Sequence, residues 1–453
     1  MAAIARRIAL SVLNLLDTSN LTLDSLLSQA FEQRPKLIQP DRALANELVF
    51  GVLRWRGRLD WVIKHLSKTP VNKIDPSVLN TLRLGLYQIL FLSRIPVSAA
   101  VNDSVELAKE KAPLWVVRFV NAVLRTAADR AKDLPLPDER DDPVAAISVR
   151  ESHPPWMVKR WLGRLGMEET TKLCRANNQI PPVTVRTNTL QTSRERLRSS
   201  LVALVREINP TRFAPEGLAL KGLEQPIAEM PPFCRGWFQV QDEAAQLIAH
   251  LLDPKPDETI LDACAGFGGK TGHTAQLMNN SGAIKAMDQH AWKLRSLVTS
   301  MKRLGISTVT TWHHDLTSPV PEDLEGVFNR ILLDAPCSGL GVIRRNPDTK
   351  RKKQEEDLTR FHDRQLDFLA CLAPLVKRGG WLVYCVCSLE PEEGDGVVED
   401  FLKSHGDFAI CRSPSRLPEM DNHFFDESGM FRTVPQEHST DGFFAVRLQR
   451  VGL

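Results

Sequence analysis

Two cysteines of this chain stand in surroundings that suit nucleophilic chemistry. Cys337 lies in the glycine-rich segment 334–341, Asp-Ala-Pro-Cys-Ser-Gly-Leu-Gly, and Cys387 ends the apolar run 383–387. A thiolate exposed at such a position can attack an electrophilic carbon, and a second thiol beside it can assist. A single free cysteine is more often a buried, inert side chain, and Cys385 fits that description. Together, Cys337 and Cys387 predict a thiolate nucleophile with a helper.

A glycine-rich loop follows the apolar strand candidate 259–264. Its residues are Cys264, Ala265, Gly266, Phe267, Gly268, Gly269 and Lys270. Glycine lets the backbone approach a ligand closely, and the start of the helix that follows favours negative charge. The loop is neither a complete G-x-G-x-x-G motif nor a P-loop, since Cys264 stands where the first P-loop glycine would lie. It predicts a site for a nucleotide-like ligand, with an ordinary strand-to-helix turn as the alternative.

Acidic residues follow the next three strand candidates, at Asp288, Asp315 and Asp334. Ligands of open α/β sheets bind outside the carboxyl ends of the strands. Each aspartate alone reads as a turn residue or a helix N-cap. Three of them at successive strand ends instead predict a ligand site. Asp288 also lies close to the spacing of the ribose-binding acid in dinucleotide folds.

The elements that must position these residues alternate regularly from residue 257 onward. The strand candidates are 259–264, 282–287, 307–312, 329–334, 381–387, 407–411 and 443–449. The helical stretches are 270–279, 291–304, 359–377 and 393–404. Such alternation predicts a mostly parallel sheet with helices on both faces. No helix separates the last two strands, so we expect them to form an antiparallel hairpin at one edge.

The rest of the chain divides into three parts. Residues 1–135 carry apolar residues at helical spacing, with prolines between the segments, and predict an all-α domain. The proline-rich, acidic stretch 136–150 predicts a linker. Residues 151–255 mix short strands and helices, which predicts a small α/β connecting subdomain ahead of the sheet domain at 256–453.

Charge is unevenly distributed in spite of a net charge of only +3 over 453 residues. Residues 1–135 contain 19 Lys/Arg and 12 Asp/Glu, a balance of +7, so the remainder sums to −4. A basic third suggests an acidic partner, and a solvated basic surface is an equal alternative. The side chains that we consider for phosphate contacts are Arg54, Arg56 and Arg58, and Arg344, Arg345 and Lys350 in a basic run after Cys337. A solvated helix start is the alternative for that run.

Composition excludes several classes of protein. The eight cysteines include no C-x-x-C pair and no Cys/His set with zinc-ligand spacing, so we expect no metal site. No apolar stretch approaches the ~18 residues of a membrane span, and the N-terminus lacks a signal-peptide core. Apolar residues at 43% and charged residues at 25% are typical of globular proteins. We therefore expect a cytoplasmic monomer with reduced thiols and no membrane contact.

Four ordered motifs give the chain a family resemblance. They are Asp-Ala-Cys-Ala-Gly-Phe-Gly-Gly-Lys-Thr (262–271), Asp-Ala-Pro-Cys-Ser-Gly-Leu-Gly (334–341), Cys-Ser-Leu-Glu-Pro-Glu-Glu (387–393) and Thr-Asp-Gly-Phe-Phe (440–444). The chain resembles the Nop/Sun family of RNA (cytosine-5) methyltransferases. Its N-terminal third, with Asn-Ala-Val-Leu-Arg at 121–125, resembles the NusB-like RNA-binding domain. The resemblance implies an all-α NusB-like domain, an RRM-like connecting subdomain and a Rossmann-type class I methyltransferase domain with a mostly parallel seven-stranded sheet.

The same resemblance implies roles for the residues singled out above. Residues 264–270 would surround the methionine and adenosine moieties of S-adenosylmethionine. Asp288 would hold the ribose hydroxyls, Asp315 the adenine amino group, and Asp334 would lie beside both cofactor and target base. Cys387 matches the nucleophile that adds to C6 of cytosine, and Cys337 matches the cysteine that assists release. DNA cytosine methyltransferases instead use a Pro-Cys nucleophile, which would select Cys337.

The resemblance also implies 16S ribosomal RNA as the substrate, with transfer RNA as the alternative. Two positions depart from the family's usual pattern. Gly266-Phe267 replaces Ala-Pro in the cofactor loop, which loosens it, and Val386 replaces a threonine before the nucleophile. A non-catalytic RNA-binding or assembly factor with a drifted loop is thus a further alternative. Retention of Asp288, Asp334 and both cysteines favours the enzyme.

Overall fold

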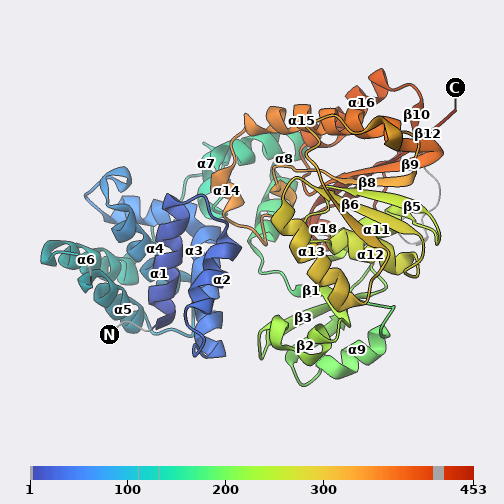
Figure 1. Cartoon of the computed structure of the whole chain (residues 1–453). Helices are drawn as coiled ribbons and strands as arrows, with labels where there is room; N and C mark the ends of the chain where they lie inside the picture. The colour runs from blue at the N-terminus through green and yellow to red at the C-terminus, as the bar shows by residue number, and fades with distance from the viewer. Residues whose placement is uncertain (1–3, 111, 132, 412–422, 453) are drawn as a thin grey trace. The chain divides into compact units, whose positions relative to one another are not determined.

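The computed structural model describes residues 4–110, 112–131, 133–411 and 423–452, which form two compact units (Figure 1). The first unit comprises Met1–Gln179 together with the short segment Asn346–Lys352. The second comprises Ile180–Arg345 and Lys353–Leu453. No helix in these described ranges is long and apolar enough to cross a membrane.

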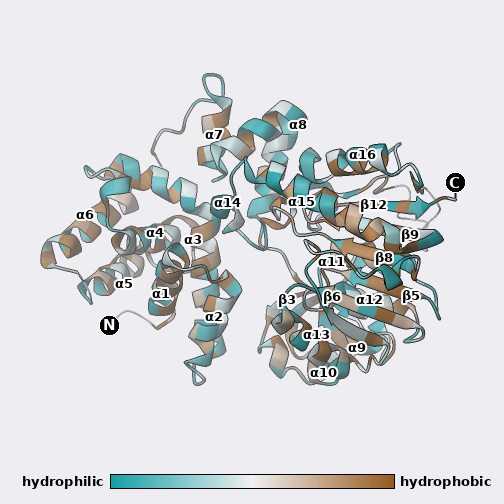
Figure 2. Cartoon of the chain, turned by 45° about the horizontal axis from the view of Figure 1, so that its top comes forward, coloured by the Kyte–Doolittle hydropathy of each residue, from teal (hydrophilic) through white to brown (hydrophobic). Residues whose placement is uncertain are grey.

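The described residues of the first unit form helices joined by loops, with no strand among them, and the all-α prediction is confirmed for residues 1–135. Its helices are α1 (Ile4–Thr18), α2 (Leu23–Glu32), α3 (Gln39–Leu66), α4 (Pro76–Phe91), α5 (Val97–Lys109), α6 (Leu114–Arg130), α7 (Pro143–Arg150), α8 (Pro155–Asn178) and α14 (Thr349–Lys352). Capping residues mark where these helices begin. At the N-terminus of α4, the Asp75 side chain accepts the backbone N–H groups of Ser77 and Val78, and Pro76 occupies the first turn. Apolar and polar bands alternate along the helices (Figure 2), and the apolar residues form one core.

The predicted linker at 136–150 contains helix α7. Asp142 caps this helix by accepting the N–H of Ala145, and Pro143 takes its first position. Beyond α7, the Ser152 hydroxyl accepts the backbone N–H of Gly57 at 2.9 Å. Helices α7 and α8 belong to the first compact unit, which ends at Gln179. The predicted domain boundary near residue 150 remains a prediction.

The second unit begins with a small antiparallel sheet in the order β2-β3-β1-β4. The strands are β1 (Val183–Thr187), β2 (Val205–Pro210), β3 (Gly217–Leu223) and β4 (Phe238–Val240), with α9 (Arg194–Leu201) and α10 (Pro231–Cys234) between them. Leu197 and Leu201 of α9 are buried in one apolar cluster with Val185 and Leu218 of the sheet. This is the small α/β subdomain that the mixed pattern predicts.

A larger sheet of eight strands follows, with the order β10-β12-β9-β8-β5-β6-β7 and with β11 paired to β12. The strands are β5 (Thr259–Ala263), β6 (Ala283–Asp288), β7 (Val309–His313), β8 (Phe328–Asp334), β9 (Val376–Val386), β10 (Phe408–Ile410), β11 (Phe431–Thr433) and β12 (Phe443–Arg450). β5 to β9 are parallel, and β12 and β10 are antiparallel at the edge, as predicted. Strand β11, which has only three residues, is not among the predicted strands, and the helix predicted at 359–377 ends earlier, because β9 begins at Val376.

Helices cover both faces of the large sheet (Figure 1). Helices α15 (Asp357–Leu372) and α16 (Asp395–Ser404) pack against one face, where Leu261, Leu333 and Leu382 point. Helices α11 (Glu243–Leu252), α12 (Gly269–Leu277) and α13 (Ala291–Leu304) cover the other. Since β5, β6, β7, β8 and β9 run in one direction, their carboxyl ends meet at a single edge. The predicted site residues lie at that edge.

Candidate functional site

The glycine-rich loop joins β5 to α12 through three residues with left-handed backbone. Cys264, Gly266 and Gly268 have φ values of 65°, 57° and 81°. At Gly268 a Cβ atom would also lie 2.7 Å from Cγ of Leu297, so both conformation and space require glycine. Gly266, which departs from the family's usual residue, therefore occupies a conformation that suits glycine. The backbone N–H of Ala265 donates to the carbonyl of Met287 at 2.8 Å and ties the loop to β6.

Asp288 closes this turn from the end of β6. Its carboxylate is buried, with Oδ2 accepting the N–H of Gly266 at 3.0 Å and Oδ1 accepting the N–H of His290 at 2.8 Å. Each carboxylate oxygen can accept more than one hydrogen bond. Both oxygens of Asp288 therefore keep an acceptor position for the hydroxyls of a ligand.

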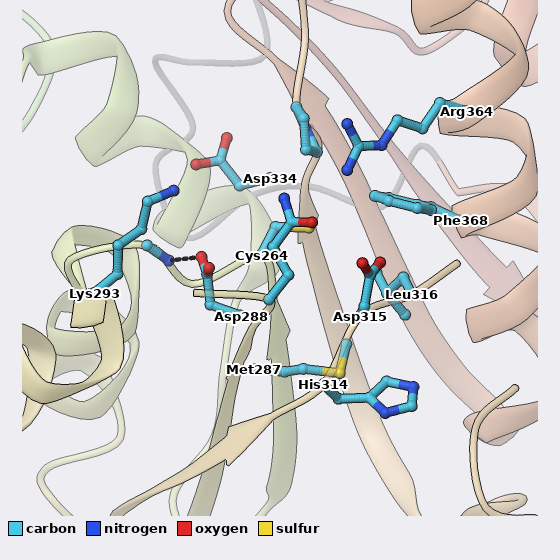
Figure 3. A pocket seen from close by; sticks show the side chains of 13 residues that line it. Cys264, Met287, Asp288, Lys293, His314, Asp315, Leu316, Asp334, Arg364 and Phe368 are labelled. Carbon is cyan, nitrogen blue, oxygen red and sulfur yellow. Dashed lines mark hydrogen bonds between the residues drawn. The ribbon is translucent and has the colours of Figure 1, made fainter. Parts of the chain in front are cut away.

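A cavity lies between this loop and α15 (Figure 3). The cavity has a volume of about 190 Å³ and is partly open to solvent. The lining residues are Cys264, Gly266, Met287, Asp288, Gln289, Lys293, His314, Asp315, Leu316, Asp334, Pro336, Arg364 and Phe368. The structure thus brings together five residues of the predicted cofactor site, namely Cys264, Gly266, Asp288, Asp315 and Asp334.

The other predicted loop residues do not line this cavity. The Phe267 side chain is 54% exposed, and its ring contacts Trp292 edge-on at 5.4 Å. The bulky residue that departs from the family's pattern consequently leaves the cavity clear. Ala265, Gly268 and Gly269 act through the backbone of the turn and of α12.

Lys270 binds the protein and not the open cavity. Its Nζ donates to Oδ2 of Asp334 at 2.6 Å and lies over the ring of Phe443. Burial disfavours the ammonium form, but the Asp334 carboxylate outweighs burial and holds the pKa of Lys270 above its usual value. The pair fixes the end of β8 against the start of α12.

Several lining residues are not foreseen from the sequence, and α15 contributes two of them. Arg364 and Phe368 are four positions apart on α15, so they share one helix face, and the guanidinium lies 5.1 Å from the ring centroid. Figure 3 shows both side chains facing Asp315 across the cavity. Nε of Arg364 is buried and has no hydrogen-bond partner among the described residues. The helical spacing was visible in the sequence, but not which face of the helix meets the strand ends.

The two cysteines that the sequence singles out are neighbours. Sγ of Cys337, after β8, lies 3.2 Å from Sγ of Cys387, after β9. The hydrogen bond to Cys387 and burial raise the pKa of Cys337 well above its usual value, so Cys337 is a thiol near neutral pH. Cys385 is buried, as expected, and its Sγ contacts Oδ1 of Asp334 at 3.4 Å. Burial, followed by the Asp334 charge, raises its pKa as well.

A buried polar cluster joins α11, α12 and the small sheet, and its residues were not predicted as a site. Nε2 of His250 lies 3.0 Å from Oε2 of Glu216, and Nε2 of His273 lies 3.9 Å from the same oxygen. Burial, and then the charge of Arg186, lower the pKa of His273 well below its usual value. Arg186 also donates to the carbonyl of Gly269 at 2.7 Å. This cluster supports the start of α12 from the side of the small sheet.

Two of the arginines considered for RNA contact form ion pairs with aspartates of the second unit. Arg344 is buried, and its Nε donates to Oδ1 of Asp441 at 2.6 Å. Arg345 donates to Oδ2 of Asp441 at 2.8 Å and to Oδ2 of Asp242 at 2.6 Å. The prediction of phosphate contacts is wrong for Arg344, because buried acidic partners distant in sequence occupy its donors.

The predicted RNA contacts of the first unit also change. Arg54 is buried, and burial lowers its pKa, so this side chain does not face a phosphate backbone. Arg56 forms an ion pair with Asp17 at 2.7 Å. Arg58 is half-buried, and burial lowers its pKa. RNA contact by Arg56 and Arg58 remains a prediction.

The prediction of a phosphate contact is also wrong for Lys350. This residue is buried in the first unit, where Nζ donates to the carbonyl of Arg54 at 3.2 Å, the carbonyl of Ser152 at 3.1 Å and Oδ1 of Asn178 at 2.8 Å. Burial lowers its pKa well below the usual value. The amine of Lys350 therefore joins α3, the turn before α8 and the end of α8, and it is unavailable to RNA.

Lys350→Met is expected to destabilise the protein. Removal of the amine leaves two buried carbonyls and the half-buried amide oxygen of Asn178 without their donor. At a cost of roughly 1 kcal/mol each, this lowers Tm by roughly 6–12 °C. Differential scanning calorimetry measures the shift. Lys352→Met, which removes only an exposed pair with Asp348, is the control and should cost at most about 1 kcal/mol. An unchanged Tm with weakened RNA binding in Lys350→Met would restore the phosphate-contact interpretation.

The fold and the site together define a class of protein. A central strand order of β9-β8-β5-β6-β7, a glycine-rich turn after β5 and acidic residues after β6, β7 and β8 form the fold of S-adenosylmethionine-dependent methyltransferases. Three family models match: "NusB family" over residues 3–129, "Methyltr_RsmF/B-like, ferredoxin-like domain" over 153–226 and "16S rRNA methyltransferase RsmB/F" over 249–449.

Similar proteins narrow the class to one family. The probable ribosomal RNA small subunit methyltransferase B of Synechocystis sp. is 36% identical over 98% of this chain and 99% of its own. The corresponding Bacillus subtilis protein is 37% identical over 99% of both chains. The crystal structure of PH0851 has a TM-score of 0.82 at 26% identity and covers 99% of both chains. The chain belongs to the ribosomal RNA small subunit methyltransferase B family.

Proposed function

We propose that this protein methylates C5 of a cytosine in 16S ribosomal RNA, with S-adenosylmethionine as the methyl donor. The observation that carries the proposal is the pair Cys337 and Cys387, whose sulfur atoms lie 3.2 Å apart after strands β8 and β9. Pro336, directly before Cys337, lines the cavity. Methyl transfer to an amine or a hydroxyl needs no thiol pair. C5 of cytosine is a poor nucleophile until a thiolate adds at C6, so two thiols match this target. The names of the family and of its relatives support RNA as the substrate.

The residues of the cavity fit the methyl donor. Asp288 keeps acceptor positions for two ribose hydroxyls, and Asp315 offers a carboxylate for the adenine amino group. A hydrogen bond from the backbone N–H of Thr317 lowers the pKa of Asp315, which keeps this acceptor ionised. Phe368 and Leu316 supply apolar surface for a base. When bound, S-adenosylmethionine supplies an electrophilic methyl group.

The thiols then divide the work between them. The Cys387 thiolate forms a bond to C6 of the cytosine, which turns the ring into an enamine whose C5 takes up the methyl group. The proton at C5 passes to solvent water, and the electron pair of the C5–H bond restores the C5–C6 double bond. The C6–S bond breaks at the same time, and its electrons leave on the Cys387 sulfur. Cys337, whose raised pKa keeps it a thiol, assists this release. Asp334, held by Lys270, lines the cavity and lies 3.4 Å from the sulfur of Cys385.

Bisulfite sequencing tests the proposal directly. The purified protein is incubated with S-adenosylmethionine and unmodified 16S ribosomal RNA, and separately with unmodified transfer RNA. We expect one protected cytosine in the ribosomal RNA. A protected cytosine only in transfer RNA would identify transfer RNA, and not 16S ribosomal RNA, as the substrate. RNA binding with no methylation, and no heat in titration calorimetry with S-adenosylmethionine, would favour the non-catalytic assembly factor.

Asp288→Ala is expected to weaken cofactor binding. Loss of a charge-assisted acceptor for ligand hydroxyls costs roughly 1.5–3 kcal/mol, which raises the Kd for S-adenosylmethionine roughly 10- to 100-fold. Isothermal titration calorimetry measures the change. Asp323→Ala removes an exposed carboxylate elsewhere in the same unit and is the control. Equal affinities for the wild type and Asp288→Ala would remove Asp288 from the cofactor site.

A further inference from the structure

Glu393 lies at the junction of the two loops that carry the cysteines. It ends the short 3-10 helix Pro391–Glu393, and its side chain is completely buried. Oε1 accepts the backbone N–H of Ser338 at 2.7 Å, and Oε2 accepts the hydroxyl of Ser388 at 2.6 Å. Ser338 directly follows Cys337, and Ser388 directly follows Cys387. One carboxylate therefore binds both residues that adjoin the cysteines.

Two more donors complete the shell of this carboxylate. The Ser338 hydroxyl donates to Oε2, and Nε2 of Gln365 lies 3.3 Å from Oε1. The two serine hydroxyls are themselves 3.2 Å apart. A buried carboxylate is stable only when such donors replace water, and charge-assisted bonds of this kind are strong and short. Neither loop could shift without breaking at least one of these bonds.

The backbone of Glu393 is held as firmly as its side chain. The hydroxyl of Tyr384, on β9, lies 2.6 Å from the Glu393 carbonyl and 3.0 Å from Oε1 of Gln365. Gln365, on α15, also donates to the carbonyl of Pro336 at 3.0 Å, directly before Cys337. Hydrogen bonds from Tyr384 on β9 and Gln365 on α15 thus fix the position of Glu393 relative to two elements of the core.

We propose that Glu393 is a positioning residue that sets the separation and orientation of Cys337 and Cys387. The inference rests on the catalytic roles proposed above for the two cysteines. Glu393 does not line the cavity, and its hydrogen bonds reach the cysteines through Ser338 and Ser388. Its charge also contributes to the raised pKa of Cys337. Misplacement of reacting groups by about 1 Å can cost about 100-fold in rate, so the carboxylate controls turnover without binding a substrate.

Oxidation by diamide measures the geometry of the cysteines without any substrate. Diamide accepts two electrons and two protons from two nearby thiols, which become a disulfide, and mass spectrometry identifies the Cys337–Cys387 peptide pair. We expect rapid formation in the wild type and at least about 10-fold slower formation in Glu393→Ala, because the loops separate. Glu399→Gln, an exposed change on α16, is the control and should match the wild type. A wild-type rate in Glu393→Ala overturns the proposal.

Steady-state kinetics provides the second measurement. Glu393→Ala should lower kcat about 100-fold while the KM for S-adenosylmethionine stays within about 3-fold. Glu393→Gln, whose amide can accept from Ser338 and donate to the serine hydroxyls, should recover most of the disulfide rate and about 10-fold of kcat. Equal losses in Glu393→Gln and Glu393→Ala would contradict positioning by these hydrogen bonds.

Two controls separate this inference from the proposed function. If Glu393→Ala does not fold by circular dichroism, Ser388→Ala removes one of the bonds and should slow the disulfide about 3-fold or more. Wild-type rates in Ser388→Ala would then overturn the proposal. If the wild type forms the disulfide but methylates no cytosine, the proposed function fails while the positioning result stands. If methylation occurs and the disulfide is insensitive to Glu393, only the positioning proposal fails.

Discussion

Replacement of Cys387 by serine is expected to lower methyl transfer by roughly 10³-fold or more, since loss of a covalent nucleophile removes the step on which the others depend. Serine keeps the size of the side chain, but its hydroxyl is not ionised near neutral pH. The variant should also form no covalent complex with RNA on a denaturing gel. Transfer of a radiolabelled methyl group to 16S ribosomal RNA measures the first effect. Cofactor affinity should stay unchanged, because Cys387 does not line the cavity.

The partner cysteine supplies the opposite result. Cys337→Ala should accumulate a covalent RNA complex, because addition proceeds but release is impaired. Cys234→Ser, at an exposed cysteine in the small-sheet part of the unit, is the matched control and should behave as the wild type. An active Cys387→Ser together with an inactive Cys337→Ala would reverse the two roles and match the Pro-Cys arrangement of DNA cytosine methyltransferases.

Asp334→Asn is expected to have the second-largest effect, a loss of about 10²-fold in transfer with a clear loss of stability. The buried ammonium of Lys270 would keep a hydrogen bond but lose its counter-charge. In the wild type the pKa of Lys270 is raised, so the pair stabilises the fold fully below the ordinary lysine pKa. That stabilisation is lost only as pH rises through the raised value, and the variant lacks it at neutral pH.

The expected cost of Asp334→Asn is about 1–3 kcal/mol, less than for a fully buried pair because the carboxylate is 34% exposed. Thermal unfolding at pH 7 should therefore show a lower Tm for Asp334→Asn than for the wild type. Glu224→Gln, which breaks the exposed pair with Arg206, is the control and should change stability by less than about 1 kcal/mol. If Asp334→Asn keeps the wild-type Tm and rate, the pair has no role in the site.

Local sequence is informative where local chemistry decides the structure. The apolar runs that end in Asp288 and Asp334 are strands, as predicted. The last two predicted strands, which no predicted helix separates, pair antiparallel at the edge of the sheet as β10 and β12. The glycine-rich turn can also be predicted from sequence, because positions with left-handed backbone such as Gly268 favour glycine. The start of α7 is also marked in the sequence, by the N-cap Asp142 and by Pro143 at the first helical position, although the acidic, proline-rich composition around them is typical of a linker.

The contacts of a side chain cannot be predicted from local sequence when its neighbours come from distant segments of the chain. The basic run contains Arg344 and Lys350, which are equally polar in sequence, yet one is paired with Asp441 and the other is enclosed by backbone carbonyls of the first unit. Arg364 lines the cavity only because α15 packs beside the strand ends. The role of Glu393 likewise depends on Ser338, which is 55 residues away. Such partners require the tertiary fold.

The segment Asn346–Lys352 has a consequence for synthesis. The first unit consists of two stretches of chain, and the second stretch follows most of the larger unit in sequence. A ribosome therefore releases helices α1 to α8 long before Lys350 emerges to bind the carbonyls of Arg54 and Ser152. The N-terminal helices can collapse early, but their native hydrogen bonding is complete only after the strands β5 to β8 have been made. Truncation after Gln179 would leave the helical unit without this last contact.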